Sequence, residues 1–287
     1  MATSCRFEFQ CKHFWYNDCE AEKFQRIQWT KNRWVHLAYR GFMFAFTLGW
    51  LIGAYVVNKD PTVYQFISNW TEVVMNLYFL VAFLVSIYGA VKRHDAPSTE
   101  QIRWFHIVNW WLFNVACTAA FNVTIFYWAL IGSRRTLERN LQPVTFHLHV
   151  TNSILFLIDI FMVAFPVRLL HFFYAPLYGV VYILFMLIIH WTGVNSAIYA
   201  AVNWATQPAI SSGYSIAAII VLPIVLHCML FGLYHLRALI ARRTVLKNEN
   251  TSRGGGPEQF GAVELGKTNE GFVVTEAPNH GTDSTAM

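Results

Sequence analysis

Charged side chains are scarce in this sequence: they make up 13% of its 287 residues, against about 25% in ordinary soluble domains. The low content of charged residues and the high content of apolar residues exclude an intrinsically disordered chain and a coiled coil. The net charge of +5 does not indicate a nucleic-acid partner, because the basic residues lie at the ends of apolar runs and form no stripe. Five cysteines are too few for a disulfide scaffold. Without HExxH, CxxC or P-loop patterns, we expect no metal and no cofactor.

Long apolar runs are what the sequence has in abundance. Hydrophobic residues make up 55% of the chain, and six runs reach the roughly 20 residues that a helix needs to cross a bilayer. These runs lie at about 35–57, 64–91, 105–131, 145–169, 176–194 and 214–239. The ten-residue alternation of a membrane β-barrel is not visible. The sequence therefore predicts an all-α fold, a six-span transmembrane helical bundle.

Lysine and arginine orient the predicted spans. They are dense before the first span, between the second and third spans and after the last one, as is typical of cytoplasmic segments. Both termini are therefore expected in the cytoplasm, although Arg134, Arg135 and Arg139 fall on the opposite side. The expected parts are a cytoplasmic N-terminal segment (1–33), a six-helix transmembrane domain (34–243) and a disordered cytoplasmic tail (244–287). The final residues carry no ER-retrieval signal, which favours the plasma membrane over the ER.

Ionisable side chains inside the spans are costly to bury, so each of them is a candidate functional residue. Arg40, His106 and His235 lie near the predicted cytoplasmic ends, where snorkelling to the interface explains them. The remaining intramembrane candidates are Glu72, His149, Asp159 and His227.

Asp159 lies ten residues after His149, on the same helix face but about 15 Å deeper. A carboxylate at that depth needs a partner, and either Arg40 or His227 can provide one. We interpret Asp159, together with Glu72 and His227, as intramembrane polar support that fixes the register of the helices.

Thr71 and His149 are the strongest candidate pair for chemistry. Thr71 lies about seven residues into the second span and His149 about four residues into the fourth, so their depths differ by roughly 5 Å. A hydroxyl beside an imidazole has the chemistry of a nucleophile activated by a base. The alternative is that the Thr71 hydroxyl donates to a carbonyl of its own helix, as membrane-helix threonines commonly do.

Several short motifs are shared, in order and spacing, with a known family. They are Glu8-Phe9-Gln10, Gln28-Trp29, Leu37-Ala38-Tyr39-Arg40, Asn69-Trp70-Thr71, Leu157-Ile158-Asp159 and Pro166-Val167-Arg168. Over roughly residues 8–243 the chain thus resembles the rolling stone family of multi-pass membrane proteins. Its namesake is associated with myoblast fusion in insects, so the resemblance implies a role in cell–cell contact or fusion. Ala200 and Asn203 stand where family members often have Pro and Asp.

A more distant similarity is to the androgen-induced, far-17a type membrane proteins. Some of these hydrolyse fatty-acid esters of hydroxy fatty acids. The stretch Leu148-His149-Val150-Thr151 resembles their Met-His-Thr motif, and Asp159 matches an acid ten residues later. Thr71 takes the position of their nucleophile, whereas Val74 stands where they have an acid. This similarity implies a lipid-ester hydrolase in which His149 takes the proton of the Thr71 hydroxyl.

Three functions therefore stay open for this chain. The first is a six-pass membrane protein that acts in cell–cell contact or myoblast-type fusion without catalysis. The second is an intramembrane lipid-ester hydrolase with Thr71 as nucleophile and His149 as base. The third is a small transporter, which would need broken helices and a continuous polar path. The expected partners are membrane lipids, with a lipid ester as substrate in the second case, and no nucleic acid.

Overall fold

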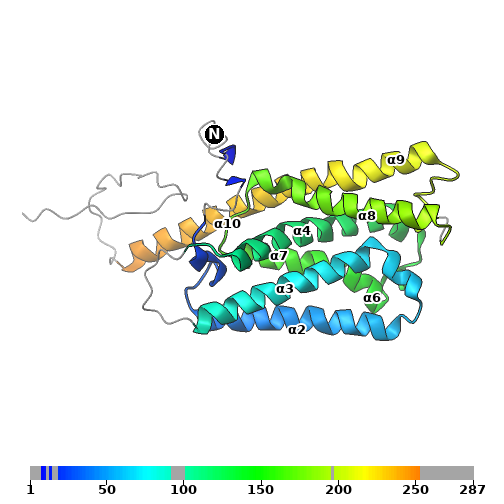
Figure 1. Cartoon of the computed structure of the whole chain (residues 1–287). Helices are drawn as coiled ribbons and strands as arrows, with labels where there is room; N and C mark the ends of the chain where they lie inside the picture. Colours follow the sequence, from blue (N-terminus) through cyan, green and yellow to red (C-terminus); the bar gives the residue numbers. More distant parts are fainter. Residues whose placement is uncertain (1–7, 11–12, 15–18, 92–100, 195–196, 253–287) are drawn as a thin grey trace, which may run out of the picture. The chain divides into compact units, whose positions relative to one another are not determined.

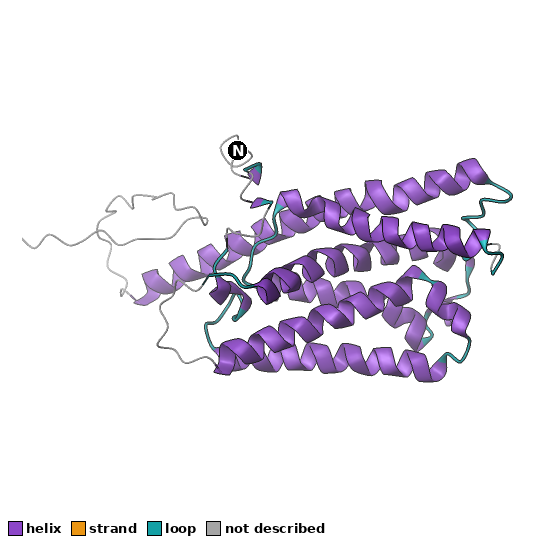
Figure 2. Ribbon diagram, viewed as in Figure 1, coloured by secondary structure: helices purple, strands orange, loops and turns teal. Residues whose placement is uncertain are grey.

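The structure is a computed structural model that describes residues 8–10, 13–14, 19–91, 101–194 and 197–252. These residues form helices joined by loops, with isolated β-bridges and no sheet among them (Figure 2). A first compact unit ends at Ala241, and a second begins at Arg242. The second unit carries the end of the last helix, which runs to Ser252. The rest of the tail that the sequence predicts to be disordered lies outside the described residues.

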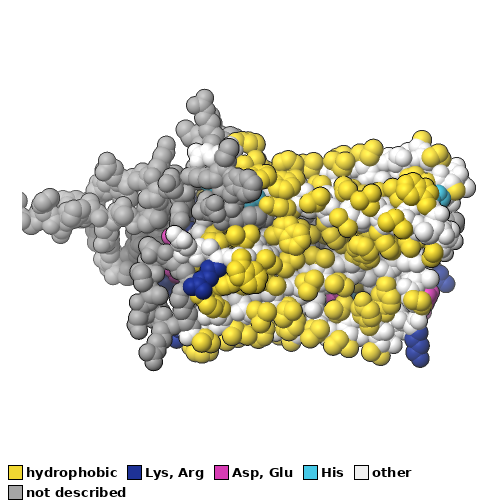
Figure 3. Space-filling model, viewed as in Figure 1, with side chains coloured by type: hydrophobic (Ala, Val, Ile, Leu, Met, Phe, Trp, Pro, Cys, Tyr) yellow, Lys and Arg dark blue, Asp and Glu magenta, His cyan; other side chains and the backbone are white. Residues whose placement is uncertain are grey.

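Six helical segments of the described chain are long and apolar enough to cross a membrane. They are Arg33–Val57, Ile67–Val91, Trp104–Arg134, Pro143–Met162, Leu169–Trp191 and Pro208–Thr244. The prediction of an all-α bundle with six spans is thus confirmed. Apolar side chains cover the face of these helices that Figure 3 shows, as expected for a surface in contact with lipid tails.

Only the first two spans are single α-helices, and the other four are built from several pieces. The elements are α2 (Arg33–Val57), η3 (Pro61–Gln65), α3 (Ile67–Val91), α4 (Trp104–Phe126), η4 (Tyr127–Ile131), η5 (Gly132–Arg134), α5 (Leu137–Asn140), α6 (Pro143–Phe146), η6 (His147–Thr151), α7 (Asn152–Met162), η7 (Leu169–Phe173), α8 (Tyr174–Trp191), α9 (Pro208–Ile216), η8 (Ala217–Val221) and α10 (Leu222–Ser252), after a short 3-10 turn η2 (Ala21–Phe24).

The helices of the first unit run side by side, with α4 at the centre of the packing (Figure 1). Helix α3 packs against both α2 and α4, and α4 also packs against α7 and α8. The sequence of α4 explains its place, because polar and apolar residues alike are buried along most of its length. Its exposed large apolar side chains are Trp104, Trp111 and Ile125, so this helix presents only a small part of its surface to lipid.

The fourth span ends earlier than the sequence predicts, at Met162 instead of 169. Pro166 disfavours helical backbone at the residue before it and cannot donate a backbone hydrogen bond. Val163 instead pairs with Ile27 in an isolated antiparallel bridge. The carbonyls of Ile160 and Phe165 accept hydrogen bonds of 2.8 and 2.9 Å from the buried Arg237 guanidinium. Arg237 thus provides hydrogen-bond donors for backbone carbonyls that have no helical partner where the helix ends.

Arg40 is buried in the bundle and does not reach the interface, so the expectation of a snorkelling side chain is wrong. Only 2% of Arg40 is exposed, and its Nη1 donates to Asp159 Oδ1 at 2.7 Å. The hydroxyls of Tyr39 and Tyr78 donate to the same carboxylate at 2.7 and 2.5 Å. Asp159 thus joins α2, α3 and α7, and of the two partners expected for it the structure selects Arg40. We call this part of the bundle the ionic half.

His106 is also fully buried, although the sequence places it at the interface. Its Nδ1 accepts a hydrogen bond of 3.1 Å from the backbone N–H of Arg103, just before α4 begins. The ring packs against Phe24 of η2, with ring centroids 5.4 Å apart. The N-terminal segment therefore covers this end of α4, which apolar periodicity within the span does not reveal.

Candidate functional site

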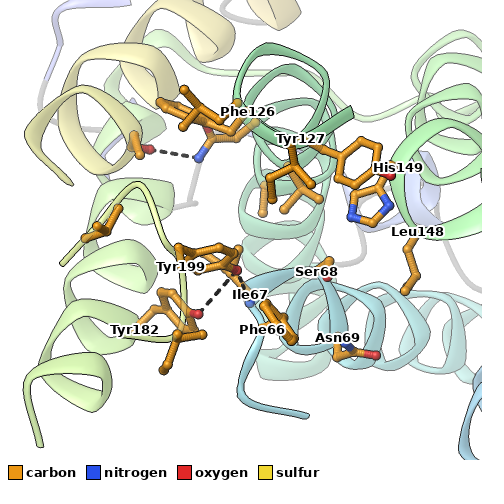
Figure 4. A pocket seen from close by; sticks show the side chains of 18 of the residues that line it. Phe66, Ile67, Ser68, Asn69, Phe126, Tyr127, Leu148, His149, Tyr182 and Tyr199 are labelled. Carbon is orange, nitrogen blue, oxygen red and sulfur yellow. Dashed lines mark hydrogen bonds between the residues drawn. The ribbon is translucent and has the colours of Figure 1, made fainter. Parts of the chain in front are cut away.

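A cavity of about 920 Å³ lies among the spans where α3 begins and α4 ends (Figure 4). Its volume falls within the roughly 300–1,000 Å³ that small-molecule sites occupy. Apolar side chains supply much of the wall, among them Ala119 and Val123 of α4, Ile183 of α8 and Ile219 of η8. We call the part of the bundle around it the cavity half.

Three π-helical segments border this cavity. They are η4, η6 and η8, and residues of each belong to its lining. A π-segment carries an extra residue per turn, and such segments are frequent at functional sites. In the residues that the structure describes, these three π-segments all border the cavity, whereas Arg40, Tyr78 and Asp159 lie in regular α-helix. The irregular backbone is therefore concentrated at the cavity, where it does not face lipid alone.

His149 of η6 points into the cavity, and its tautomer is fixed by its neighbours. Its Nδ1 lies 2.8 Å from the carbonyl oxygen of Thr145. Because a carbonyl only accepts, Nδ1 carries the hydrogen and Nε2 of the neutral ring is an acceptor. The ring stacks on Tyr127 of η4, with centroids 3.6 Å apart (Figure 4). His149 is therefore held in one orientation with its basic nitrogen unused by the described residues.

Thr71 is fully packed in α3 and does not contact His149. Its hydroxyl lies 3.3 Å from the Tyr178 hydroxyl, and 1% of the residue is exposed. Tyr178 lines the cavity, whereas Thr71 is not part of the described lining. The structure thus places Thr71 one side chain behind the cavity wall. The catalytic roles of Thr71 and His149 stay predictions.

Glu72 has a partner that the sequence reasoning missed. Its Oε1 lies 3.0 Å from Nε2 of His147, and both side chains are buried. His147 also stacks on Trp50 of α2, with ring centroids 4.5 Å apart. The depth argument used for Thr71 and His149 applies equally to Glu72 and His147. It would have found this pair.

The other two residues predicted as polar support lie away from the cavity lining. Asp159 holds Arg40 in the ionic half. His227 of α10 places its Nε2 2.9 Å from the carbonyl oxygen of Arg168, in the segment after the broken fourth span. In the described ranges, no group of three His, Cys, Asp or Glu side chains is arranged to hold a metal ion.

Tyr199 holds the loop before α9 against the start of α3. Its hydroxyl accepts a hydrogen bond of 3.0 Å from the Ile67 backbone N–H and lies 3.4 Å from the Tyr182 hydroxyl (Figure 4). Tyr199 also lines the cavity. Burial raises the pKa of Tyr199 to about 12, because the charged phenolate is disfavoured there.

Comparison with known proteins relates nearly the whole described chain to one protein family. A family model described as "Protein rolling stone" matches residues 1–251. The protein rolling stone of Drosophila melanogaster is 25% identical over 251 residues, which cover 82% of this chain and 90% of that relative. No solved structure matches the chain.

Proposed function

Because the chain belongs to the rolling stone family of multi-pass membrane proteins, we propose that it binds one amphipathic lipid in its cavity. The observation that carries this proposal is a ligand-sized cavity of about 920 Å³ within membrane-spanning helices. Lipids are the apolar molecules that surround such helices, and a wall rich in apolar side chains suits their tails. Family membership confirms the resemblance seen in the sequence but does not by itself name a ligand.

The charges on the cavity wall suggest how the lipid lies. Arg134 and Arg135 are its only charged lining residues among those described, and both are exposed. Arg134 ends the third span and Arg135 follows it, at the level where lipid headgroups begin. A phosphate or ester headgroup beside the two arginines leaves the tail to pack against Ala119 and Ile219, deeper in the cavity.

The cellular role that we propose is cell–cell contact or myoblast-type fusion in the plasma membrane, with both termini in the cytoplasm. It rests on the family resemblance and on the positive residues that flank the spans. If lipid binding serves this role, filling the cavity should reduce cell mixing in a fusion assay. If wild type and a cavity-filled variant that has lost its lipid mix cells equally, the role in cell fusion does not depend on the cavity.

Hydrolysis of a lipid ester is the second candidate, favoured by the fixed tautomer of His149. In this reaction Nε2 takes the proton of the Thr71 hydroxyl while its oxygen attacks the acyl carbon. The alcohol leaves with that proton, and water then releases the acid from the acyl-Thr71. The step requires Thr71 to leave Tyr178 and reach His149. We therefore rank it below binding without catalysis.

Lipid binding is tested by filling the cavity with one side chain. Ala119 is 5% exposed and lines the cavity, so Ala119→Phe places a ring inside it. Ala45 is exposed on α2 outside the cavity, and Ala45→Phe is the matched control. Native mass spectrometry of the purified full chain should show a bound lipid in wild type and the control, and its loss in Ala119→Phe. A wild type that carries no lipid under any purification would overturn the proposal.

Hydrolysis is tested with a fluorophosphonate probe on the detergent-solubilised chain. We expect labelling of wild type that both Thr71→Ala and His149→Ala remove. Thr192→Ala, which removes an exposed hydroxyl at the end of α8, should keep it. Folding of each variant is checked by size-exclusion chromatography. A folded wild type without labelling removes the hydrolase candidate and leaves lipid binding in place.

A further inference from the structure

Among the residues that the structure describes, two polar atoms in the cavity wall have no hydrogen-bond partner. They are Oγ1 of Thr118 and Oδ1 of Asn122, both on α4 and both buried from solvent. Thr118 is 0% exposed as a whole residue. The two residues are four apart, so they lie on the same face of the helix, one turn from each other. Together they form a small polar patch in an otherwise apolar part of the wall.

Thr118 differs from several other hydroxyls of the bundle. The Thr47 hydroxyl donates to the Met43 carbonyl at 3.0 Å, and the Ser86 hydroxyl to the Phe83 carbonyl at 2.7 Å. Such bonds within the helix are the ordinary way to satisfy a hydroxyl in a membrane span. The Thr118 hydroxyl makes no such bond. Its hydrogen-bonding capacity is therefore unused by the described residues.

The hydrogen bond made by the side-chain nitrogen of Asn122 fixes which way its amide points, and this leaves the side-chain oxygen as an acceptor. Its Nδ2 donates to the Ala218 carbonyl at 2.8 Å, which ties α4 to η8. A carbonyl only accepts, so the amide cannot be turned around without losing that bond. The unused Oδ1 therefore requires a donor from the ligand. Thr118 beside it can accept or donate, and a ligand hydroxyl has both capacities.

The charges of the wall exclude a cationic donor. In the lining as described, no acidic side chain is present to pair with an ammonium group. The only charged lining residues are Arg134 and Arg135, and Arg134 lies roughly 18 Å from Asn122 along the helix at 1.5 Å per residue. An uncompensated charge at this depth would be costly. The group that fits is a neutral donor.

We infer that the ligand of this cavity is a lipid alcohol, whose hydroxyl donates to Asn122 Oδ1 and accepts from Thr118 Oγ1. The inference rests on the proposed lipid-binding function and names the class of lipid. Sterols, diacylglycerols and long-chain alcohols share this chemistry, because each carries a hydroxyl on an apolar body. The hydroxyl then lies in the deep part of the cavity and the apolar body lies between it and the arginines. This orientation is the reverse of the one that the two arginines alone suggest, because a lipid alcohol has no charged headgroup that needs them.

The test compares each lipid alcohol with its methyl ether, which keeps the apolar body and loses the donor. Cholesterol, dioleoylglycerol and oleyl alcohol, each with its ether, compete with a photoreactive analogue of oleyl alcohol for the full chain in nanodiscs. At least one alcohol should bind roughly tenfold more tightly than its ether, because the ether leaves buried acceptors unpaired. The lipid with the largest ratio identifies the source of the hydroxyl.

Two variants test whether the preference for an alcohol over its ether depends on Thr118 Oγ1 and Asn122 Oδ1. Thr118→Val and Asn122→Leu keep the size of each side chain, and we expect each to lower the alcohol-to-ether ratio to near one without weakening the ether. Ser215 also borders the cavity, but its hydroxyl already donates to the Ser211 carbonyl at 2.7 Å. Ser215→Ala is therefore the matched control and should keep the ratio.

The possible outcomes distinguish failure of the lipid-alcohol inference from failure of the proposed lipid binding. Equal binding of alcohols and ethers by wild type overturns the inference and leaves lipid binding intact. A preference that survives in folded Thr118→Val and Asn122→Leu also overturns it. If neither alcohols nor ethers bind, lipid binding itself fails. Should Asn122→Leu not fold, Thr118→Val and the ratio measured on wild type decide the matter.

Discussion

The ionic half and the cavity half of this bundle share α3 but otherwise draw mainly on different helices, and they use their buried polar groups differently. In the ionic half, Asp159 receives hydrogen bonds from Arg40, Tyr39 and Tyr78. In the cavity half, Thr118 and Asn122 keep polar atoms without partners. Satisfied networks make a unique packing, whereas unsatisfied atoms lower stability and are available to a ligand. This difference supports the proposal that the cavity half binds a ligand, whereas the ionic half holds helices together.

The backbone follows the same division. Regular α-helix surrounds Asp159 in α2, α3 and α7. Three π-segments surround the cavity. Open space and irregular turns in the cavity half fit the proposal of a binding site there, because function commonly draws on the less stable parts of a protein.

The largest effect expected from this comparison is the loss of Asp159. Asp159→Leu leaves the Arg40 guanidinium buried without its counter-ion, which should cost about 3–5 kcal/mol of stability. Thermal unfolding followed by size-exclusion chromatography in detergent measures it. Adding Arg40→Met to Asp159→Leu should recover part of the loss, because no unpaired charge stays buried. A single variant as stable as wild type would remove the distinction between the halves.

A smaller effect is expected where the cavity half is tightly packed. A Cβ at Gly179 of α8 would lie 2.8 Å from Cγ2 of Ile219 in η8, so Gly179→Ala should cost about 1–3 kcal/mol by overpacking. Ile219→Ala in the same chain should restore stability, since it removes the obstructing branch. Gly232→Ala is the control, because nothing lies within 4 Å of its added Cβ. Equal melting temperatures for Gly179→Ala and Gly232→Ala would contradict the close packing of α8 on η8.

His149 should matter less for stability than Asp159, although both are ionisable groups inside spans. His149→Ala loses the stack on Tyr127, which is worth about 0.5–1.5 kcal/mol. His149→Phe keeps a ring in that place and should lose less. The same unfolding assay ranks these variants. If His149→Ala proves as damaging as Asp159→Leu, the cavity half depends on its histidine for the fold and not for a ligand.

The smallest effect concerns the loop that Tyr199 holds at the cavity. Burial raises the Tyr199 pKa from 10.0 to about 12. The stability that depends on its neutral hydroxyl is therefore fully present below pH 10 and lost as the pH rises through about 12. The tyrosinate absorbance of wild type minus that of Tyr199→Phe should titrate near pH 12. A difference that titrates near pH 10 would mean that the loop does not bury this phenol.

Particular residues show why part of the site was predictable. The cost of placing charge in lipid made Glu72, His149 and Asp159 candidates at once, and all three take part in specific contacts. Thr118 and Asn122 drew no attention, because uncharged polar residues in spans usually bond within their own helix. What distinguishes them is that their unpaired atoms belong to residues of the cavity wall, and this depends on neighbouring helices.

Hydropathy alone determined that this chain has six helices long and apolar enough to cross a membrane, because a bilayer admits few other solutions for a long apolar run. Residue order and spacing also determined its family. The tertiary structure alone decided which groups meet: Asp159 with Arg40, Glu72 with His147, and Thr71 with Tyr178. Depth along a helix can be read from sequence at 1.5 Å per residue. Rotation about the helix axis, π-turns and neighbouring helices set the direction of each side chain, and these depend on packing across the whole bundle.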